Sequence, residues 1–291
     1  GGLIHRMPWV AWLTLVGVLA IAGLPPLNGF VSEWLLLQAF LFSHEVPHQF
    51  VNMLLPLGAA IIALAAALAA YVMVKFFGVI FLGQPREAAL AQAHDAGGYE
   101  KAGLAWLAIG CVLLGLFPAQ VIGALGAATV QLIGAAPAAE ASPWWMLAPL
   151  PGRQVSYAPI VLLVVMLVVL AATSILVRRV YRRKVRRAPA WDCGFGRIDA
   201  RMQDTAEGFG QPIRHIFQAF FTMERELPSP FDHAPRYRVV VGDRIWRAIY
   251  APVGGIVQRI ADSLAWLQQG RISAYLLYSF ITLVVLLAVV L

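Results

Sequence analysis

The stretch "GLPPLNGFVSEW" (residues 23–34) interrupts an apolar run with two adjacent prolines, an asparagine and a glutamate. Proline lacks a backbone N–H and clashes with the carbonyl four residues before it, so Pro25-Pro26 predicts a break in the helix. Gly23 and Gly29 give the backbone room to turn on either side of this break. Inside a bilayer, such a break is tolerated only where the freed backbone groups pack in protein or line a wet cavity. We therefore expect a discontinuous membrane helix here.

The composition indicates an all-α integral membrane protein. The 291 residues are 60% hydrophobic and 13% charged, whereas soluble domains carry about a quarter charged residues. Several segments approach the ~20 apolar residues that span a bilayer. The formal net charge of +7 is concentrated in "RRVYRRKVRR" (178–187), which holds seven of the 22 Lys and Arg residues. A basic block beside an apolar span indicates topology, so the bilayer is an expected partner and nucleic acid is not.

We predict about five transmembrane helices, of which the first is the broken one. They cover residues 9–43, 52–82, 102–117, 157–177 and 272–291. The chain then consists of transmembrane helices over 1–177, a cytoplasmic segment over 178–271 and a final transmembrane helix over 272–291. An apolar Gly/Ala-rich stretch at 119–136 leaves open a sixth piece that lies on the surface or re-enters the membrane.

The positive charges set the orientation if the broken helix crosses the membrane once. Arg6, Arg86, Lys101 and the basic block then collect on the cytoplasmic side, and the outer side keeps Arg153. This distribution follows the positive-inside rule and places the C-terminus outside.

The cytoplasmic segment has two parts. The first, "WDCGFGRIDARMQDTAEGFGQP" (191–212), is polar and Gly-rich and predicts an ordered or semi-ordered loop. In the second part an apolar stripe opposes an Arg-rich face, which favours an amphipathic helix lying on the membrane. We expect Pro252 and Gly254-Gly255 to kink it; an ordinary surface helix of a small cytoplasmic domain is the alternative. The stripe consists of Ile245, Ile249, Val253, Ile256, Ile260, Leu264 and Leu267.

Glu33 is the principal candidate for function. Asn28 is a candidate cap for the second half-helix, whose positive N-terminal end favours an anion nearby. An ionisable residue at membrane depth costs about 2.5–3.5 kcal/mol on insertion scales, so its default interpretation is functional. A carboxyl group at a helix break can transfer protons if water or another titratable group reaches it. The alternative is that Glu33 lies near the outer interface and anchors the helix there.

Lys75 is the other charged residue inside a predicted span. It lies roughly 12 Å of helix rise from Gly83 at the cytoplasmic end, a distance over which a lysine side chain can largely snorkel. A functional role and simple snorkelling both remain open. The spacing of the sequence does not show a partnership with Glu33.

Other titratable groups give weaker signals. His44, Glu45 and His48 in "HEVPH" have metal-ligand types, but Pro47 opposes a helix there, and we favour an exposed loop over a metal site. His94 and Asp95 favour a solvated loop over a proton-collecting pair. The sequence has no cysteine cluster for iron–sulfur binding, no phosphate-binding glycine loop and no nucleophile elbow. We expect no cofactor, metal or redox centre in this chain.

Several of these stretches resemble a known family. "GLPPLNGFVSEWL" (23–35) is similar to the discontinuous helix of proton-translocating antiporter-like subunits in respiratory complex I, Mrp antiporters and membrane-bound hydrogenases. The stretches "VKFFGVIFLGQPREAALAQAHD" (74–95) and "GCVLLGLFP" (110–118) resemble the helices that follow in that family. "WDCGFG" and "RMQDTAEGFGQPIRHIF" (201–217) resemble its hydrogenase-4 and formate hydrogenlyase branch. The resemblance covers nearly the whole chain.

The resemblance implies that Glu33 matches the family's ionisable residue on the second half of the broken helix, where the proton path bends outward. Lys75 matches a position that the family often fills with a basic residue. The family's other channel residues, a glutamate–lysine pair and a central lysine, lie on earlier helices that this sequence does not contain. With its start at "GGLIHRMP", the chain is expected to be the C-terminal portion of a longer subunit and unable to pump alone.

The expected function is therefore proton (or sodium) translocation coupled to redox chemistry in a hydrogenase-4 or formate-hydrogenlyase type complex. The expected setting is a bacterial inner membrane, with other membrane subunits and a peripheral redox arm as partners. The alternatives are a complex I or Mrp-type subunit and a structural scaffold that conducts no ions. A stand-alone solute transporter is disfavoured because few polar groups converge on one site.

Overall fold

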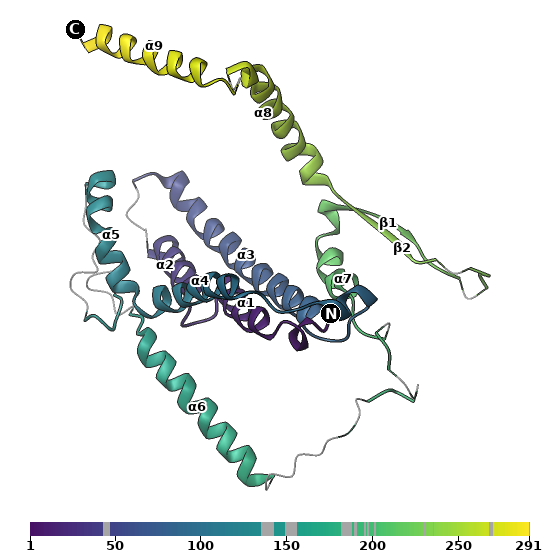
Figure 1. Ribbon diagram of the computed structural model, residues 1–291. Helices are drawn as coiled ribbons and strands as arrows, with labels where there is room; N and C mark the ends of the chain where they lie inside the picture. Colours follow the sequence, from purple (N-terminus) through teal and green to yellow (C-terminus); the bar gives the residue numbers. More distant parts are fainter. Residues whose placement is uncertain are drawn as a thin grey trace. The chain divides into compact units, whose positions relative to one another are not determined.

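The computed structural model describes residues 1–42, 47–134, 143–148, 156–181, 188, 191–194, 196, 198–200, 202–229, 231–234, 236–267 and 270–290. Helices dominate this part of the chain (Figure 1), which confirms the predicted all-α membrane class. The chain divides into two compact units, Gly1–Phe209 and Gly210–Leu291.

Four helices pack together at the centre of the first unit. They are α1 (Pro8–Ile21), α2 (Asn28–Phe42), α3 (Gln49–Phe81) and α4 (Gly98–Leu116). Both α1 and α2 contact α3 and α4. At 1.5 Å per residue, α1 and α2 are each only about 22 Å long, whereas α3 is about 50 Å long. The predicted discontinuity of the first span is thus confirmed.

The two halves of the broken helix, α1 and α2, lie in succession along the side of α3. The Gly2 N–H donates to the Leu82 carbonyl at 2.8 Å, so the start of the chain lies beside the end of α3. Near the other end of α3, a Cβ built at Gly58 would lie 2.6 Å from the ring of Phe40 on α2. The break therefore falls in the middle of a single crossing, the arrangement from which the orientation was inferred.

Four helices of the described chain are long and apolar enough to cross a bilayer, and they fall on four of the predicted spans. They are α3, α4, α6 (Pro159–Val180) and α9 (Ile272–Val290). The Gly/Ala-rich stretch that left a sixth piece open forms α5 (Pro118–Ile133). Its first residue is a proline, which cannot continue α4 but fits the first turn of a new helix. Short 3₁₀ turns occupy Leu3–His5 and Ala88–Gln92.

The boundary between the two units falls within α7 (Ala206–Ile216). The sequence predicted a loop through residue 212, and that prediction is wrong for residues 206–212. The Thr205 hydroxyl oxygen accepts the Gly208 N–H at 2.9 Å and so caps the first turn of the helix. The stabilisation from this cap outweighs the helix-destabilising effect of the two glycines in the segment.

The second unit contains a two-stranded antiparallel hairpin that the sequence analysis did not predict. Strand β1 (Phe221–Glu226) pairs with β2 (Arg238–Asp243), with Phe221 opposite Asp243 and Glu226 opposite Arg238. Three consecutive valines in β2 favour extended backbone, since β-branched side chains fit a pleated strand. A short 3₁₀ turn, Gln218–Phe220, leads into β1.

A helical segment follows the hairpin directly. The Asp243 carboxylate accepts the Trp246 N–H at 2.9 Å, as an N-cap does. A π-helical turn over Trp246–Tyr250 precedes α8 (Ala251–Leu264) and a 3₁₀ turn, Ala265–Leu267. Pro252 lies in the first turn of α8 and cannot donate to the turn before it, so the irregularity falls ahead of the proline. The apolar stripe of this segment is exposed from Ile245 through Leu264, and Leu267 is half-buried.

Some sequence predictions fall outside the described residues. These are the ones for His44, Glu45, Arg153 and residues 182–187 of the basic block.

Candidate functional site: a carboxylate at the helix break

The first half-helix ends in a hydrogen-bonded turn built around Gly23. The Gly23 N–H donates to the Ala20 carbonyl at 3.1 Å, and the Leu24 N–H donates to the Leu19 carbonyl at 3.1 Å. This pair of bonds is a Schellman motif, which requires a left-handed residue, and Gly23 has φ +67°. The backbone groups freed at the end of α1 are therefore partly satisfied within the chain.

The chain then turns through Pro25-Pro26, whose peptide bond is cis, and starts α2 at Asn28. The predicted capping role of Asn28 is not what the structure shows. Asn28 is the first residue of the helix instead of the residue before it, and its Oδ1 atom is buried without a hydrogen-bond partner. Because the turn at Leu24–Leu27 places Leu27 ahead of the helix, the Leu27 carbonyl accepts the Val31 N–H at 3.5 Å.

Two glycines allow other backbones to approach the break closely. A Cβ built at Gly29 would overlap the Ala20 carbonyl oxygen and lie 2.8 Å from the Ala20 carbonyl carbon. A Cβ built at Gly115, near the end of α4, would overlap the Pro26 carbonyl oxygen and lie 2.6 Å from the Leu27 carbonyl carbon. The break is therefore packed against protein on two sides, as a bilayer interior requires.

The carboxylate of Glu33 lies against Gly23, inside the break. A Cβ built at Gly23 would overlap Oε2 of Glu33 and lie 3.1 Å from its Cδ and 3.4 Å from its Oε1. The side chain is half-buried. In the part of the chain that the structure describes, no hydrogen bond or ion pair is made to this carboxylate, and its contact is with the glycine backbone. The carbonyl end of α1 and the N–H end of α2 meet beside it, and these helix ends carry opposite partial charges.

An aromatic cluster covers the neighbouring face of α2. The ring of Tyr157 lies 5.2 Å from Phe30 and 5.7 Å from Trp34, measured between ring centroids. Val31 and Leu147 are buried in the same cluster, and Leu147 and Tyr157 exchange backbone hydrogen bonds of 2.8 Å. These contacts exclude water from one side of the helix turn that carries Glu33.

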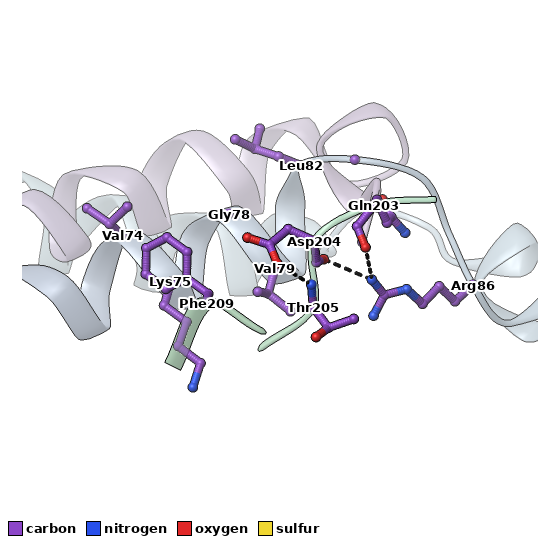
Figure 2. A pocket seen from close by; sticks show the side chains of 12 residues that line it. Val74, Lys75, Gly78, Val79, Leu82, Arg86, Gln203, Asp204, Thr205 and Phe209 are labelled. Atoms are coloured by element: carbon purple, nitrogen blue, oxygen red, sulfur yellow. Dashed lines mark hydrogen bonds between the residues drawn. The ribbon is translucent and has the colours of Figure 1, made fainter. Parts of the chain in front are cut away.

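Lys75 lies in a different place, beside a cavity of about 310 Å³ near the end of α3. Figure 2 shows its ammonium group pointing away from the polar residues Arg86, Gln203 and Asp204. Phe40 on α2 packs against Gly58, which is about 25 Å of helix rise from Lys75. Glu33 is only about 10 Å from Phe40 along α2. The structure therefore does not bring Lys75 and Glu33 together.

Residues 198–200 and 202–209 form a strap that lies against this end of α3. Gln203 bonds the backbone of Gln84 through both atoms of its amide, each at 2.8 Å. The Arg86 guanidinium donates to the carbonyls of Gln203 and Asp204 at 3.3 Å and 2.9 Å (Figure 2). It also donates to the Ala200 carbonyl at 3.3 Å. The strap holds residues 202–209 against the helix that carries Lys75. Sequence reasoning missed these contacts, because they join residues more than a hundred positions apart.

Asp95 has a structural role that the predicted solvated loop does not describe. Its carboxylate accepts the N–H groups of Trp9 at 2.9 Å and Val10 at 3.3 Å, at the start of α1. Burial opposes ionisation of this group, but the bonds from Trp9, Ala96 and Val10 and the charge of Lys101 outweigh it, so the pKa of Asp95 lies below its ordinary value. Asp95 therefore fixes the start of the broken helix.

Replacing Asp95 by asparagine is expected to lower the thermal stability of the purified complex at pH 7. A depressed pKa in the folded state means that the carboxylate stabilises the fold above its unfolded pKa of about 3.9 and loses this effect as the pH falls through the folded value. The difference between variant and wild type should thus be full at pH 7 and shrink below about pH 4. Thermal unfolding at several pH values measures it. Glu87→Gln, an exposed carboxylate on the same side, is the control and should show no such difference.

Among the described residues, no three His, Cys, Asp or Glu side chains converge as metal ligands would. His48 is exposed. The chemistry available at the break is therefore that of one carboxyl group and the surrounding backbone.

The fold and this site define a class: polytopic membrane proteins with an ionisable residue at a helix break. Comparison with known proteins agrees with that class. Residues 1–55 match the family described as NADH:quinone oxidoreductase/Mrp antiporter, transmembrane. The N-terminal part of the chain, which contains the broken helix, is therefore similar to this family of membrane subunits.

Two curated relatives from Escherichia coli (strain K12) extend the similarity along the chain. Hydrogenase-4 component B is 30% identical over 99% of this chain and 44% of its own length. Formate hydrogenlyase subunit 3 is 33% identical over 82% of this chain and 36% of its own length. The chain thus spans less than half the length of the curated relatives it matches.

A solved structure shares the fold. A chain of the membrane-bound sulfane sulfur reductase, an archaeal respiratory membrane complex, superposes with a TM-score of 0.56 at 21% identity, over 99% of this chain and 41% of that one.

Gly115 is the residue of the break that sequence reasoning missed. The available signal was a single glycine in the last turn of a span, since small residues mark close helix approach in membranes.

Proposed function

We propose that the chain is part of an ion-translocating membrane subunit in which Glu33 transfers protons at the break of the first span. The observation that supports this most directly is that its carboxylate contacts Gly23, between the two half-helices. A carboxyl group placed there can take a proton from one side and release it to the other without passing through intact helix. The proton is the proposed coupling ion, because a carboxyl group can itself take up and release one.

The similarity to hydrogenase-4 component B and formate hydrogenlyase subunit 3 supports the finer proposal. In that proposal the subunit works in a hydrogenase-4 or formate-hydrogenlyase type complex of a bacterial cytoplasmic membrane. Other membrane subunits and a peripheral redox arm are its partners, and the end of α9 faces outward. Lys75 is proposed to assist at the cytoplasmic end, beside the strap.

The proposal is tested with the complex purified from native membranes through a tag on this protein. The proteins that co-purify should include a redox arm of hydrogenase type. After reconstitution into liposomes, turnover with the substrate of that arm should produce a pH gradient that an uncoupler abolishes. A gradient that forms in sodium-free buffer assigns the proton, whereas a strict need for Na⁺ assigns sodium. Full redox turnover without any ion gradient would leave a structural scaffold and overturn the proposal.

A further inference from the structure

We propose that Gly23 is a positioning residue for the Glu33 carboxylate, in addition to ending the first half-helix. The inference rests on the proposed proton-transfer role of Glu33. It starts from the observation that the Glu33 carboxylate lies where the side chain of any residue other than glycine at position 23 would be.

The geometry of this contact is specific to the carboxyl group. A Cβ at Gly23 would overlap Oε2 and lie within 3.4 Å of both Cδ and Oε1 of Glu33, and no atom of another residue is among its three nearest neighbours. An added methyl group would therefore displace the carboxylate and leave the packing of the half-helices in place. By contrast, a Cβ at Gly29 would meet the backbone of Ala20. Gly29 is thus required for packing, and Gly23 for the position of the acid.

The position of Gly23, which the carboxylate contacts, is fixed by backbone hydrogen bonds of the helix end. Its N–H donates to the Ala20 carbonyl at 3.1 Å, its φ is left-handed at +67°, and the direction that a Cβ would take points at the Glu33 carboxylate of α2. The carboxylate accordingly rests against a part of the chain that belongs to α1, while its own backbone belongs to α2. Its position then depends on how the two half-helices are placed, which is the variable that a proton-transfer step at the break has to control.

The test is a double-mutant cycle on the reconstituted complex. Gly23→Ala is expected to lower redox-driven proton translocation about 10²-fold, the size of effect that a displacement near 1 Å can have on a reacting group. Glu33→Asp shortens the acid by one methylene and withdraws it from residue 23. In the Glu33→Asp background, Gly23→Ala should therefore change the rate by less than about threefold, because the overlap is gone.

Gly134→Ala is the matched control for backbone strain. Gly134 also has a left-handed φ, +70°, and also follows the end of a helix, but nothing lies within 4 Å of a Cβ built there. This variant should keep wild-type translocation. If Gly23→Ala fails to accumulate in the membrane, the double variant should restore accumulation.

The outcomes separate this inference from the proposed function. Unchanged proton translocation in the Glu33→Gln variant would contradict the proposed function itself. Loss in Glu33→Gln with no loss in Gly23→Ala overturns the positioning role alone. An equal loss from Gly23→Ala in the wild-type and Glu33→Asp backgrounds also overturns it, because the effect would then be backbone strain.

Discussion

Replacing Glu33 by glutamine is expected to lower redox-driven proton translocation about 10²-fold or more, the contribution typical of a positioned acid–base group. Glutamine keeps the length and shape of the side chain and removes its ability to titrate. Because the carboxylate contacts Gly23 and makes no hydrogen bond or ion pair with the described residues, the change should leave the fold intact. The measurement is the initial rate of acidification in liposomes, compared with the membrane content of the complex.

Two companion variants sharpen this experiment. Glu33→Asp retains the acid and should keep a measurable part of the rate. Glu87→Gln removes an exposed carboxylate next to Arg86 and should have no effect. If Glu33→Gln reduces the amount of assembled complex and the rate in equal proportion, the residue is an anchor for the helix. That result would favour the alternative in which Glu33 stabilises the outer end of the span.

The position of the break could be predicted from the sequence because its causes are local. Pro25-Pro26 excludes a continuous helix from covalent geometry alone, and a glycine before it supplies the left-handed residue that ends α1. The long apolar helices were predictable for a similar reason, since length and composition decide them.

The partners of the break could not be predicted, because they depend on contacts between distant segments. Asn28 is a good capping residue by type, yet the turn through Leu24–Leu27 starts the helix at Asn28 itself, one residue earlier than a cap at this position would need. Asp95 lies in a stretch with an ordinary loop sequence, and only the tertiary structure places its carboxylate on the first turn of α1. The strap over α3 depends on bonds from Arg86 to Ala200, Gln203 and Asp204, which leave no periodic signal in the sequence. The hairpin at β1 and β2 was missed because its valine run is short.

Replacing Gly115 by leucine is expected to cause the largest loss of stability of any change considered for this chain. A Cβ at this position would overlap the Pro26 carbonyl oxygen and lie 2.6 Å and 2.7 Å from the carbonyl carbon and Cα of Leu27. All of these are backbone atoms, so no side-chain rotation can relieve the overlap, and α4 has to move away from the break. Overpacking of this kind typically costs about 1–3 kcal/mol, and occasionally more. Membrane content and the thermal unfolding of the complex measure the loss.

The same helix provides the control that makes this prediction decisive. Gly110 lies one and a half turns earlier on α4, and nothing lies within 4 Å of a Cβ built there. Glycine costs a helix about 1 kcal/mol relative to better helix formers, so Gly110→Leu should be neutral or stabilising. Gly115→Ala should fall between wild type and Gly115→Leu, because the cost grows with the volume forced against the backbone. Equal stability of the leucine variants at both positions would mean that α4 does not pack on the break. The freed carbonyl of Pro26 would then face lipid, which the hydrocarbon interior does not permit at low cost.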